Sequence, residues 1–209
     1  MLHEVFNFGE GAFQQGAMDA LFGGGKLSVA CLALFNAFYI GALDTLNELA
    51  AVIAEPPYAE TASIKSAYVK AFYNPATGLF SDTERHTHSA LHSNALPLCF
   101  GIATDDMVST LRAFIMEKGL SCGVQFSYFV LKALSKIGAY DDELALLVNE
   151  SEHSWVNMVR EDASCCFEAW GKDQKWNTSL CHPWASAPIA VLFEDLRDKY
   201  GITLERIAD

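Results

Sequence analysis

Apolar residues recur along most of this chain three or four residues apart, which is the spacing of helical turns. Clear examples are the apolar positions between residues 126 and 137 and those between residues 189 and 196. Runs that alternate apolar and polar residues, as strands do, are hard to find. The pattern predicts helices over residues 27–54, 58–72, 87–102, 105–118, 123–137, 141–150 and 179–199.

The segments between these helices carry turn-forming residues. Pro56 and Pro57 end the first long helix, because proline cannot donate the hydrogen bond that a helix interior requires. Residues 74–78, Asn-Pro-Ala-Thr-Gly, have the composition of a turn. Gly119 and Gly138 each end a helix, and after the second of them we expect Asp141 to cap the next helix.

No linker divides the chain, so the sequence predicts a single all-α domain over residues 1–209. Residues 1–26 form a glycine-rich, irregular lead-in to the first long helix. The predicted helices come in pairs about 40–50 residues apart, which is typical of stacked helical hairpins. The fold expected from the pattern alone is therefore an array of helical hairpins.

The apolar run from residue 27 to residue 43 is the one candidate for a membrane span. A span needs about 20 apolar residues. This run is shorter, and the acidic residues Asp44 and Glu48 follow it while the helical apolar pattern continues. We interpret it as a buried core helix and expect no membrane association.

The composition indicates a globular protein with a surplus of apolar surface. Hydrophobic residues make up 51% of the chain, and charged residues 19%, below the usual value of about 25%. Either the core is large or a partner covers part of the surface. The net charge of −12 argues against nucleic acid as a partner, because a phosphate backbone requires clustered cations. A neutral ligand such as a sugar is compatible with this charge.

The cysteines and histidines favour neither a metal site nor a cofactor. The six cysteines contain no Cys-x-x-Cys pair, and the adjacent Cys165 and Cys166 suit reduced thiols better than a disulfide framework. His88 and His92 have the spacing of a two-histidine metal site and lie near His86, but the glutamate of the His-Glu-x-x-His pattern is missing. No signal peptide is visible, so we expect a cytoplasmic protein, or a secreted one if the chain is part of a longer precursor.

Residues 150–184 hold the densest group of unusual side chains, including all four tryptophans. Tryptophan beside polar groups can form a platform for a sugar ring. The same tryptophans could instead form a packing corner between helices. Glu168 follows Phe167 and lies two residues before Trp170. Such neighbours would desolvate its carboxylate, favour the protonated form and tune it for acid–base chemistry. The alternative is an ordinary surface glutamate.

Four stretches together resemble one enzyme family. Residues 162–170, Asp-Ala-Ser-Cys-Cys-Phe-Glu-Ala-Trp, resemble a small-residue segment that ends in an aromatic, Glu, any residue and Trp. Residues 179–184, Ser-Leu-Cys-His-Pro-Trp, resemble the Ser-Leu-x-His motif that follows it. Residues 152–155 and 94–101 are similar to the short Ser-Trp element and the Asn-Ala-Leu helix upstream. The family is the α-L-rhamnosidases among the glycoside hydrolases, whose catalytic domain is an (α/α)6 toroid.

The resemblance implies roles for five residues. Glu168 matches the general base that deprotonates water for attack on the anomeric carbon with inversion. His182 matches a histidine that contacts the substrate. The tryptophans at the same site would line the pocket: Trp155, Trp170 and Trp184. No metal or other cofactor is implied.

The general acid of the family is missing from the residues that match. It lies in a motif with Asp, Cys, Pro and an Arg-Glu pair, and no such run occurs here; Glu4 and Glu10 are poor substitutes. The match corresponds to the second half of a catalytic domain. We therefore expect an incomplete (α/α)6 toroid, an open horseshoe of about seven or eight helices. It would associate with itself or with a chain that supplies the missing half.

Two functions are compatible with these residues. The first is hydrolysis of terminal α-L-rhamnosides with Glu168 as base and the acid supplied from elsewhere. The second is a carbohydrate-binding or structural remnant of such an enzyme that has no turnover.

Overall fold

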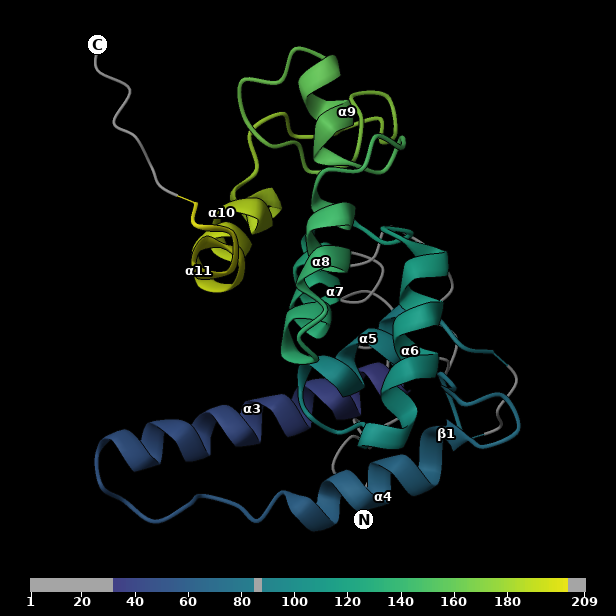
Figure 1. The fold of residues 1–209 in the computed structure, drawn as a ribbon, viewed down its shortest axis with the longest axis vertical. Coiled ribbons are helices and arrows are strands. Elements are labelled where there is room, and N and C mark those ends of the chain that lie inside the picture. The colour runs from purple at the N-terminus through teal and green to yellow at the C-terminus, as the bar shows by residue number, and fades with distance from the viewer. Residues whose placement is uncertain (1–31, 85–87, 203–209) are drawn as a thin grey trace. The chain divides into compact units, whose positions relative to one another are not determined.

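The computed structural model describes residues 32–84 and 88–202, which divide into two compact units on either side of the bond between Ser93 and Asn94. Their regular structure is helical except for one short hairpin (Figure 1). The predicted lead-in, residues 1–26, lies outside the described residues. The predicted all-helical class agrees with the elements seen.

The first unit is built on helix α3 (Leu32–Val52) and helix α4 (Ala62–Phe72). The amide of Asn47 bonds twice to the backbone of Ala59, which secures the loop between the helices. Asp44 accepts a hydrogen bond from Thr61 and forms an ion pair with Lys65 at 2.8 Å. Part of the helix predicted over residues 27–54 is therefore seen, and it ends shortly before the two prolines.

A short antiparallel hairpin follows α4, with β1 (Tyr73–Asn74) paired to β2 (Leu79–Phe80). The turn predicted over residues 74–78 is confirmed: Gly78 has a positive φ and its N–H donates to the carbonyl of Asn74. Two-residue strands are too short to produce an alternating pattern, so the sequence did not reveal them. The aromatic rings of Tyr68, Phe72 and Phe80 are buried together beside the hairpin.

Asp82 organises the chain after the hairpin. Its carboxylate accepts hydrogen bonds from the N–H of Ala90 at 2.9 Å and the hydroxyl of Ser93 at 2.6 Å, and it pairs with the ring of His88. These bonds hold both the residues just before helix α5 (Leu91–Cys99) and the first turn of the helix. The helix begins later than the predicted start at residue 87.

The second unit contains helices α6 (Asp105–Lys118), α7 (Val124–Lys136) and α8 (Tyr140–Leu147), close to their predicted bounds. Gly119 and Gly138 follow α6 and α7 with positive φ, as predicted. The prediction that Asp141 caps the next helix is wrong. Ala139 occupies the cap position of α8 without a side-chain bond, and Asp141 lies in the first turn, where its charge still favours the positive end of the helix.

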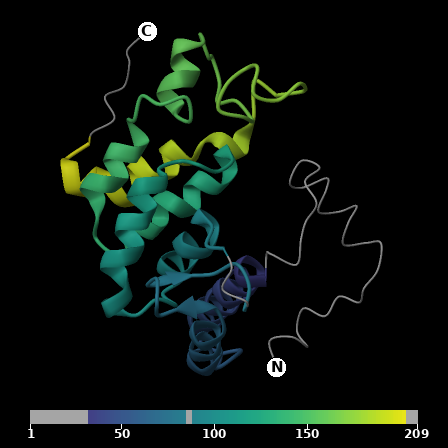
Figure 2. The same ribbon diagram turned by 90° about the vertical axis from the view of Figure 1, so that its right-hand side faces the viewer.

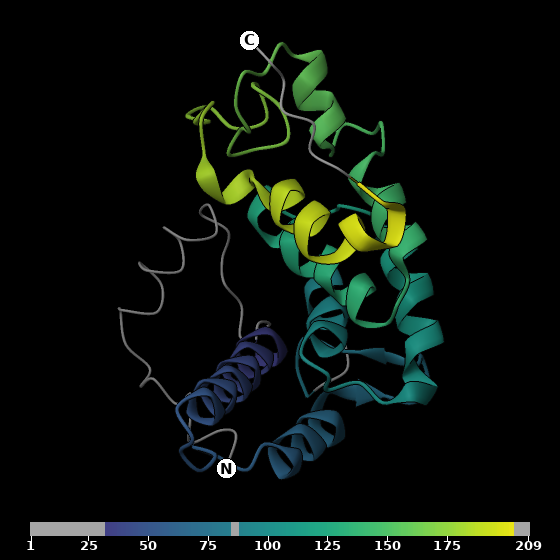
Figure 3. The ribbon, with the colours of Figure 1, turned by 60° about the vertical axis from the view of Figure 1, so that its left-hand side comes forward.

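The remaining helices are short. Helix α9 (Trp155–Arg160), which the apolar pattern did not predict, is capped by the hydroxyl of Ser154, which accepts from Asn157 N–H. Irregular chain then lies beside α9 (Figure 2). It leads into the 3-10 turn η2 (Pro183–Ala185) and a continuous helical stretch made of α10 (Ala187–Val191), the π-helical η3 (Leu192–Leu196) and α11 (Arg197–Tyr200) (Figure 3).

The helix predicted over residues 179–199 begins late, at Pro183, for a physical reason. The carbonyl of Ser179 and the N–H of His182 bond to Glu168 and Cys166 in the preceding segment, so these two backbone groups are not available for helical bonds. The later part of the prediction is correct, and α10 packs along α7 within this unit. Over residues 32–84 and 88–202, no helix has both the length and the hydropathy that a membrane crossing needs.

Candidate functional site

Two segments of the second unit bring the predicted site residues together. The N–H of Glu168 donates to the carbonyl of Ser179 at 2.8 Å, and the N–H of His182 donates to the carbonyl of Cys166 at 2.9 Å. The segments therefore run antiparallel, and the loop 169–178 connects them. This pairing places Glu168 and His182 on neighbouring stretches of chain although they are far apart in sequence.

The carboxylate of Glu168 is held by two donors. Lys175 Nζ lies 2.6 Å from Oε1, and the N–H of Ser179 donates to Oε2 at 3.1 Å. The hydrogen bond from Lys175 and the one from the Ser179 amide lower the pKa of Glu168, which means that they stabilise its charged form. The side chain remains 17% exposed, so solvent can reach it.

The expectation that aromatic neighbours would favour a protonated Glu168 is wrong in direction. The ring of Phe167 is buried in the core, and the backbone N–H of Phe167 donates to the sulfur of Met158. The carboxylate points the other way, toward Lys175 and Ser179. Two residues adjacent in sequence thus have different surroundings here, so a neighbour in sequence is a poor guide to what desolvates a side chain.

His182, which is half-buried, and Trp184, which is exposed, form a pair of rings at the site. Their ring centroids lie 4.1 Å apart with the planes inclined by 42°. The charge of His182 contributes to the lowered pKa of Glu168, so the imidazole lies within electrostatic reach of the carboxylate. Trp184 is 44% exposed and therefore has indole surface that a ligand could cover.

Trp155 and Trp170 lie beneath this surface instead. They are 8% and 3% exposed, and their rings meet edge to face with centroids 5.0 Å apart. The indole N–H of Trp170 donates to the carbonyl of Cys122 at 2.6 Å, and that of Trp155 to the carbonyl of Ala185 at 2.9 Å. Buried indoles need such partners. These bonds tie the irregular segment to the helices that surround it.

Lys175 is the functional neighbour that sequence reasoning missed. It lies in the loop between the two paired segments, and nothing in its local sequence distinguishes it from other surface lysines. Only the antiparallel pairing of residues 166–168 with 179–182 brings its ammonium group back to Glu168.

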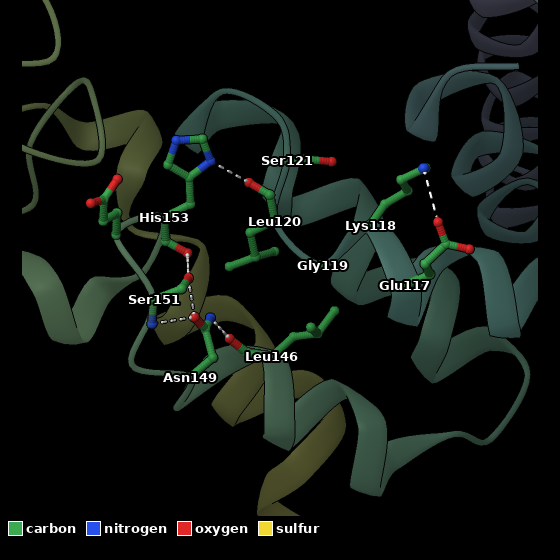
Figure 4. Close-up of a pocket in the computed structure, with 10 residues that line it drawn as sticks. Glu117, Lys118, Gly119, Leu120, Ser121, Leu146, Asn149, Ser151 and His153 are labelled. Atoms are coloured by element: carbon green, nitrogen blue, oxygen red, sulfur yellow. Dashed lines mark hydrogen bonds and ion pairs between the residues drawn. The ribbon is translucent and has the colours of Figure 1, made fainter. Parts of the chain in front are cut away.

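A separate open cavity of about 570 Å³ lies on another part of the same unit (Figure 4). Residues 117–121 form one wall, and Leu146, Asn149 and residues 151–153 complete it. His153 joins the cavity to the site segment, because its Nδ1 lies 3.2 Å from the carbonyl of Leu120 and its ring stacks on Trp170. Glu168, His182 and Trp184 are not among its lining residues.

The histidines singled out for metal binding do not form a metal centre in the described chain. His86 lies outside the described residues. His88 pairs with Asp82, and burial lowers the pKa of His92. Among residues 32–84 and 88–202, no group of three or more His, Cys, Asp or Glu side chains is arranged to hold a metal ion.

Comparison with known families finds one family model that matches most of this chain, including the site segment. The model of the bacterial alpha-L-rhamnosidase 6 hairpin glycosidase domain matches residues 30–196, which include Glu168 and His182. Comparison with curated proteins finds no match. A six-hairpin domain implies an (α/α)6-type fold, in keeping with the helices seen here. The chain therefore belongs to the family of bacterial α-L-rhamnosidase six-hairpin glycosidase domains.

Proposed function

We propose that this chain hydrolyses terminal α-L-rhamnosides with inversion at the anomeric carbon, and that Glu168 is the general base. The observation that carries the proposal is an ionised carboxylate beside the ring pair of half-buried His182 and exposed Trp184, within the region that matches the glycosidase domain. A general base must be unprotonated before it can accept a proton from water.

The surroundings of Glu168 suit that task. The bonds from Lys175 and Ser179 keep the carboxylate charged at neutral pH. A lowered pKa also makes each carboxylate a weaker base, so this site favours full ionisation over intrinsic basicity. Two carboxyl groups of an inverting glycosidase stand about 6.5–9.5 Å apart, which leaves room for the attacking water. We place that water on the side of Glu168 that faces His182.

The exposure of each aromatic side chain determines whether it can contact the substrate. His182 and Trp184 can touch a sugar directly, because part of their surface is open. Trp155 and Trp170 are buried and do not contact the sugar. Their indole N–H groups bond to backbone carbonyls, so they hold the segment in place. In this proposal the sequence-predicted tryptophans divide into one contact residue and two positioning residues.

The general acid comes from outside the described residues, through self-association or a partner chain. The first unit offers an apolar surface for such an association, since the end of α3 and the loop after it expose large hydrophobic side chains: Leu49, Val52, Ile53 and Tyr58. Light scattering at high protein concentration tests this point. A clean monomer that still turns over substrate would contradict it.

The test of the base is a set of aryl α-L-rhamnosides whose leaving groups differ in acidity. An acidic phenol leaves without protonation, so its release depends on the base and not on the missing acid. We expect Glu168→Gln to lower this rate by about 10²–10⁴. Asp173→Asn is the matched control, because Asp173 is an exposed carboxylate in the same loop. Turnover that survives Glu168→Gln overturns the assignment.

One observation favours the second function, carbohydrate binding without turnover. Both oxygens of Glu168 already have protein donors, Lys175 on one and Ser179 on the other. A purely structural carboxylate would be held in this way. Calorimetry with rhamnose separates the two functions: binding without release of phenol from any aryl rhamnoside, including the most acidic, identifies a binding domain.

A further inference from the structure

Three thiols surround the paired segments of the site. Cys165 and Cys166 begin one segment, and Cys181 lies next to His182 in the other. The bond from His182 N–H to the carbonyl of Cys166, 2.9 Å long, holds the two segments together at the point where these thiols lie. Cysteines 16 positions apart in sequence are thus neighbours in the fold.

Cys165 and Cys181 are the most exposed of these three thiols, and both are free. The pKa of Cys165 is raised, and the largest cause is an interaction with the side chain of Cys181. Cys166 acts on Cys165 through its charge alone, and it is less exposed. A bridge between the adjacent Cys165 and Cys166 would also close a small strained ring.

The other cysteines of the described chain behave differently. Cys99 and Cys122 are buried, and burial raises their pKa values to about 11 and about 12. Thiols of this kind are inert, because the thiolate is the reactive form and reagents cannot reach it. Oxidation of this part of the chain should therefore concentrate on the segments beside Glu168.

We propose that Cys165 and Cys181 form a reversible disulfide that joins the segment carrying Glu168 to the segment carrying His182. The oxidant is a low-molecular-weight disulfide such as oxidised glutathione. One cysteine thiolate attacks a glutathione sulfur and expels a glutathione thiolate. The second cysteine thiolate attacks the protein-bound sulfur of the mixed disulfide and expels the second glutathione. The protein loses two protons and two electrons, and one glutathione disulfide becomes two thiols.

The bridge has a structural consequence. It closes the loop 169–178 covalently, in addition to the backbone bonds of Glu168 with Ser179 and of His182 with Cys166. Lys175 lies within the closed loop, so the ion pair with Glu168 is confined as well. The bridge is independent of the proposed function, because it is measured on thiols and backbone amides and not on turnover.

The test uses the whole purified chain, equilibrated with oxidised and reduced glutathione, alkylated with N-ethylmaleimide and digested with trypsin. We expect the loss of two reactive thiols per chain and a link between peptides 161–172 and 176–197, which reduction reverses. Cys165→Ser and Cys181→Ser should each abolish the link, and Cys166→Ser, the matched control, should retain it. Because the pKa of Cys165 is raised, formation should also speed up as the pH rises above neutral.

The outcomes that overturn the proposal are equally direct. They are a link that depends on Cys166, glutathione adducts that never resolve into a protein disulfide, or full alkylation of every exposed thiol after oxidation. Mapping of the unmodified chain provides the answer even if a serine variant folds poorly. Hydrogen exchange at the amides of Glu168 and His182, slower in the oxidised chain, provides a second reading.

Discussion

Glu168 and Glu143 are glutamates of the same unit with opposite electrostatic surroundings. Glu168 has a lysine at 2.6 Å and a backbone amide, and its pKa is lowered. Glu143, in α8, is fully buried, and from the described residues neither of its carboxylate oxygens receives a hydrogen bond. Burial, and then the charge of Asp195, raise the pKa of Glu143 to about 8.

The two glutamates differ in whether a lysine bonds to them directly. Lys175 bonds directly to Glu168. The charge of Lys132 acts on Glu143, but the ammonium group bonds to Asp195 at 2.7 Å and to Glu194 at 3.1 Å. Burial opposes the charge of Lys132, yet its bonds to these two carboxylates raise its pKa. Because its pKa is about 8, Glu143 is mostly neutral at pH 7. A buried glutamate is thus a poor base here, and a paired, partly exposed one is a candidate.

The largest effect on stability should follow removal of the ammonium group of Lys132, which lies beside the carboxyl groups of Asp195 and Glu194. Lys132→Met leaves the carboxylates of Asp195 and Glu194 without a partner beside the buried Glu143. The lysine and Asp195 side chains are only 14% and 11% exposed, so little solvent compensates. We expect a loss of about 3–5 kcal/mol in the free energy of unfolding, measured by urea denaturation at pH 7.

Lys136→Met on the same helix is the control, because Lys136 is exposed. It should change stability by less than about 0.5 kcal/mol. Adding Glu143→Gln to Lys132→Met should recover little of this loss at pH 7, since Glu143 is already neutral at that pH. Equal losses for the two lysine variants would show that the buried charges are not coupled.

A smaller, pH-dependent effect is expected for Glu143→Gln. The folded pKa of about 8 lies above the ordinary value of 4.5, so folding takes up a proton between these values. The stability of the parent therefore falls as the pH rises through this window, by at most about 1.4 kcal/mol per unit. The amide of the variant does not titrate. Relative to the parent, the variant should gain about 1–3 kcal/mol between pH 5 and pH 9.

Denaturation at several pH values measures this difference. A constant offset between Glu143→Gln and the parent, from acid to alkaline pH, would show that the pKa of Glu143 is the same in the folded and unfolded states. Glu143 would then be surrounded by more compensating groups than its buried position indicates. The contrast with Glu168 would disappear.

The helices were predictable because their causes are local. The apolar spacing of α6 and α7, with a glycine after each, lies within a short window of sequence. The predictions failed where the cause was distant. Residues 179–182 were assigned to a helix but are not helical, because Ser179 and His182 bond to Glu168 and Cys166 instead. Helix α9 has only six residues and too little length for a periodic pattern.

The sequence named candidate site residues but did not reveal the environment of Glu168. Glu168 and His182 could be identified by resemblance, and the structure does place them on paired segments. The direction of the Glu168 pKa could not, because it depends on Lys175, a residue brought back by a loop. The burial of Trp155 and Trp170 likewise depends on distant carbonyl groups, at Ala185 and Cys122, that accept their N–H groups.

The smallest effect should be seen in Lys175→Met, which tests the other half of the comparison. The Ser179 amide remains, so the pKa of Glu168 should rise toward its ordinary value without exceeding it. A lowered carboxylate pKa contributes stability above the ordinary pKa, and this contribution is lost as the pH falls through the folded value. The variant should thus lose less than about 1 kcal/mol at neutral pH, since the lysine is 40% exposed, and nothing in strong acid.

Carbon NMR titration of the Glu168 carboxyl group measures the shift, and Lys175→Arg, which keeps the charge, should leave it near the parent value. The same variant also joins the titration to the chemistry. If Glu168 is the base, the acidic limb of the pH–rate profile must move upward by the same interval as the titration, because both report one proton on one carboxylate. If the acidic limb of the pH–rate profile stays in place while the NMR titration moves, the rate depends on another group. Glu168 would then be a structural residue of the loop.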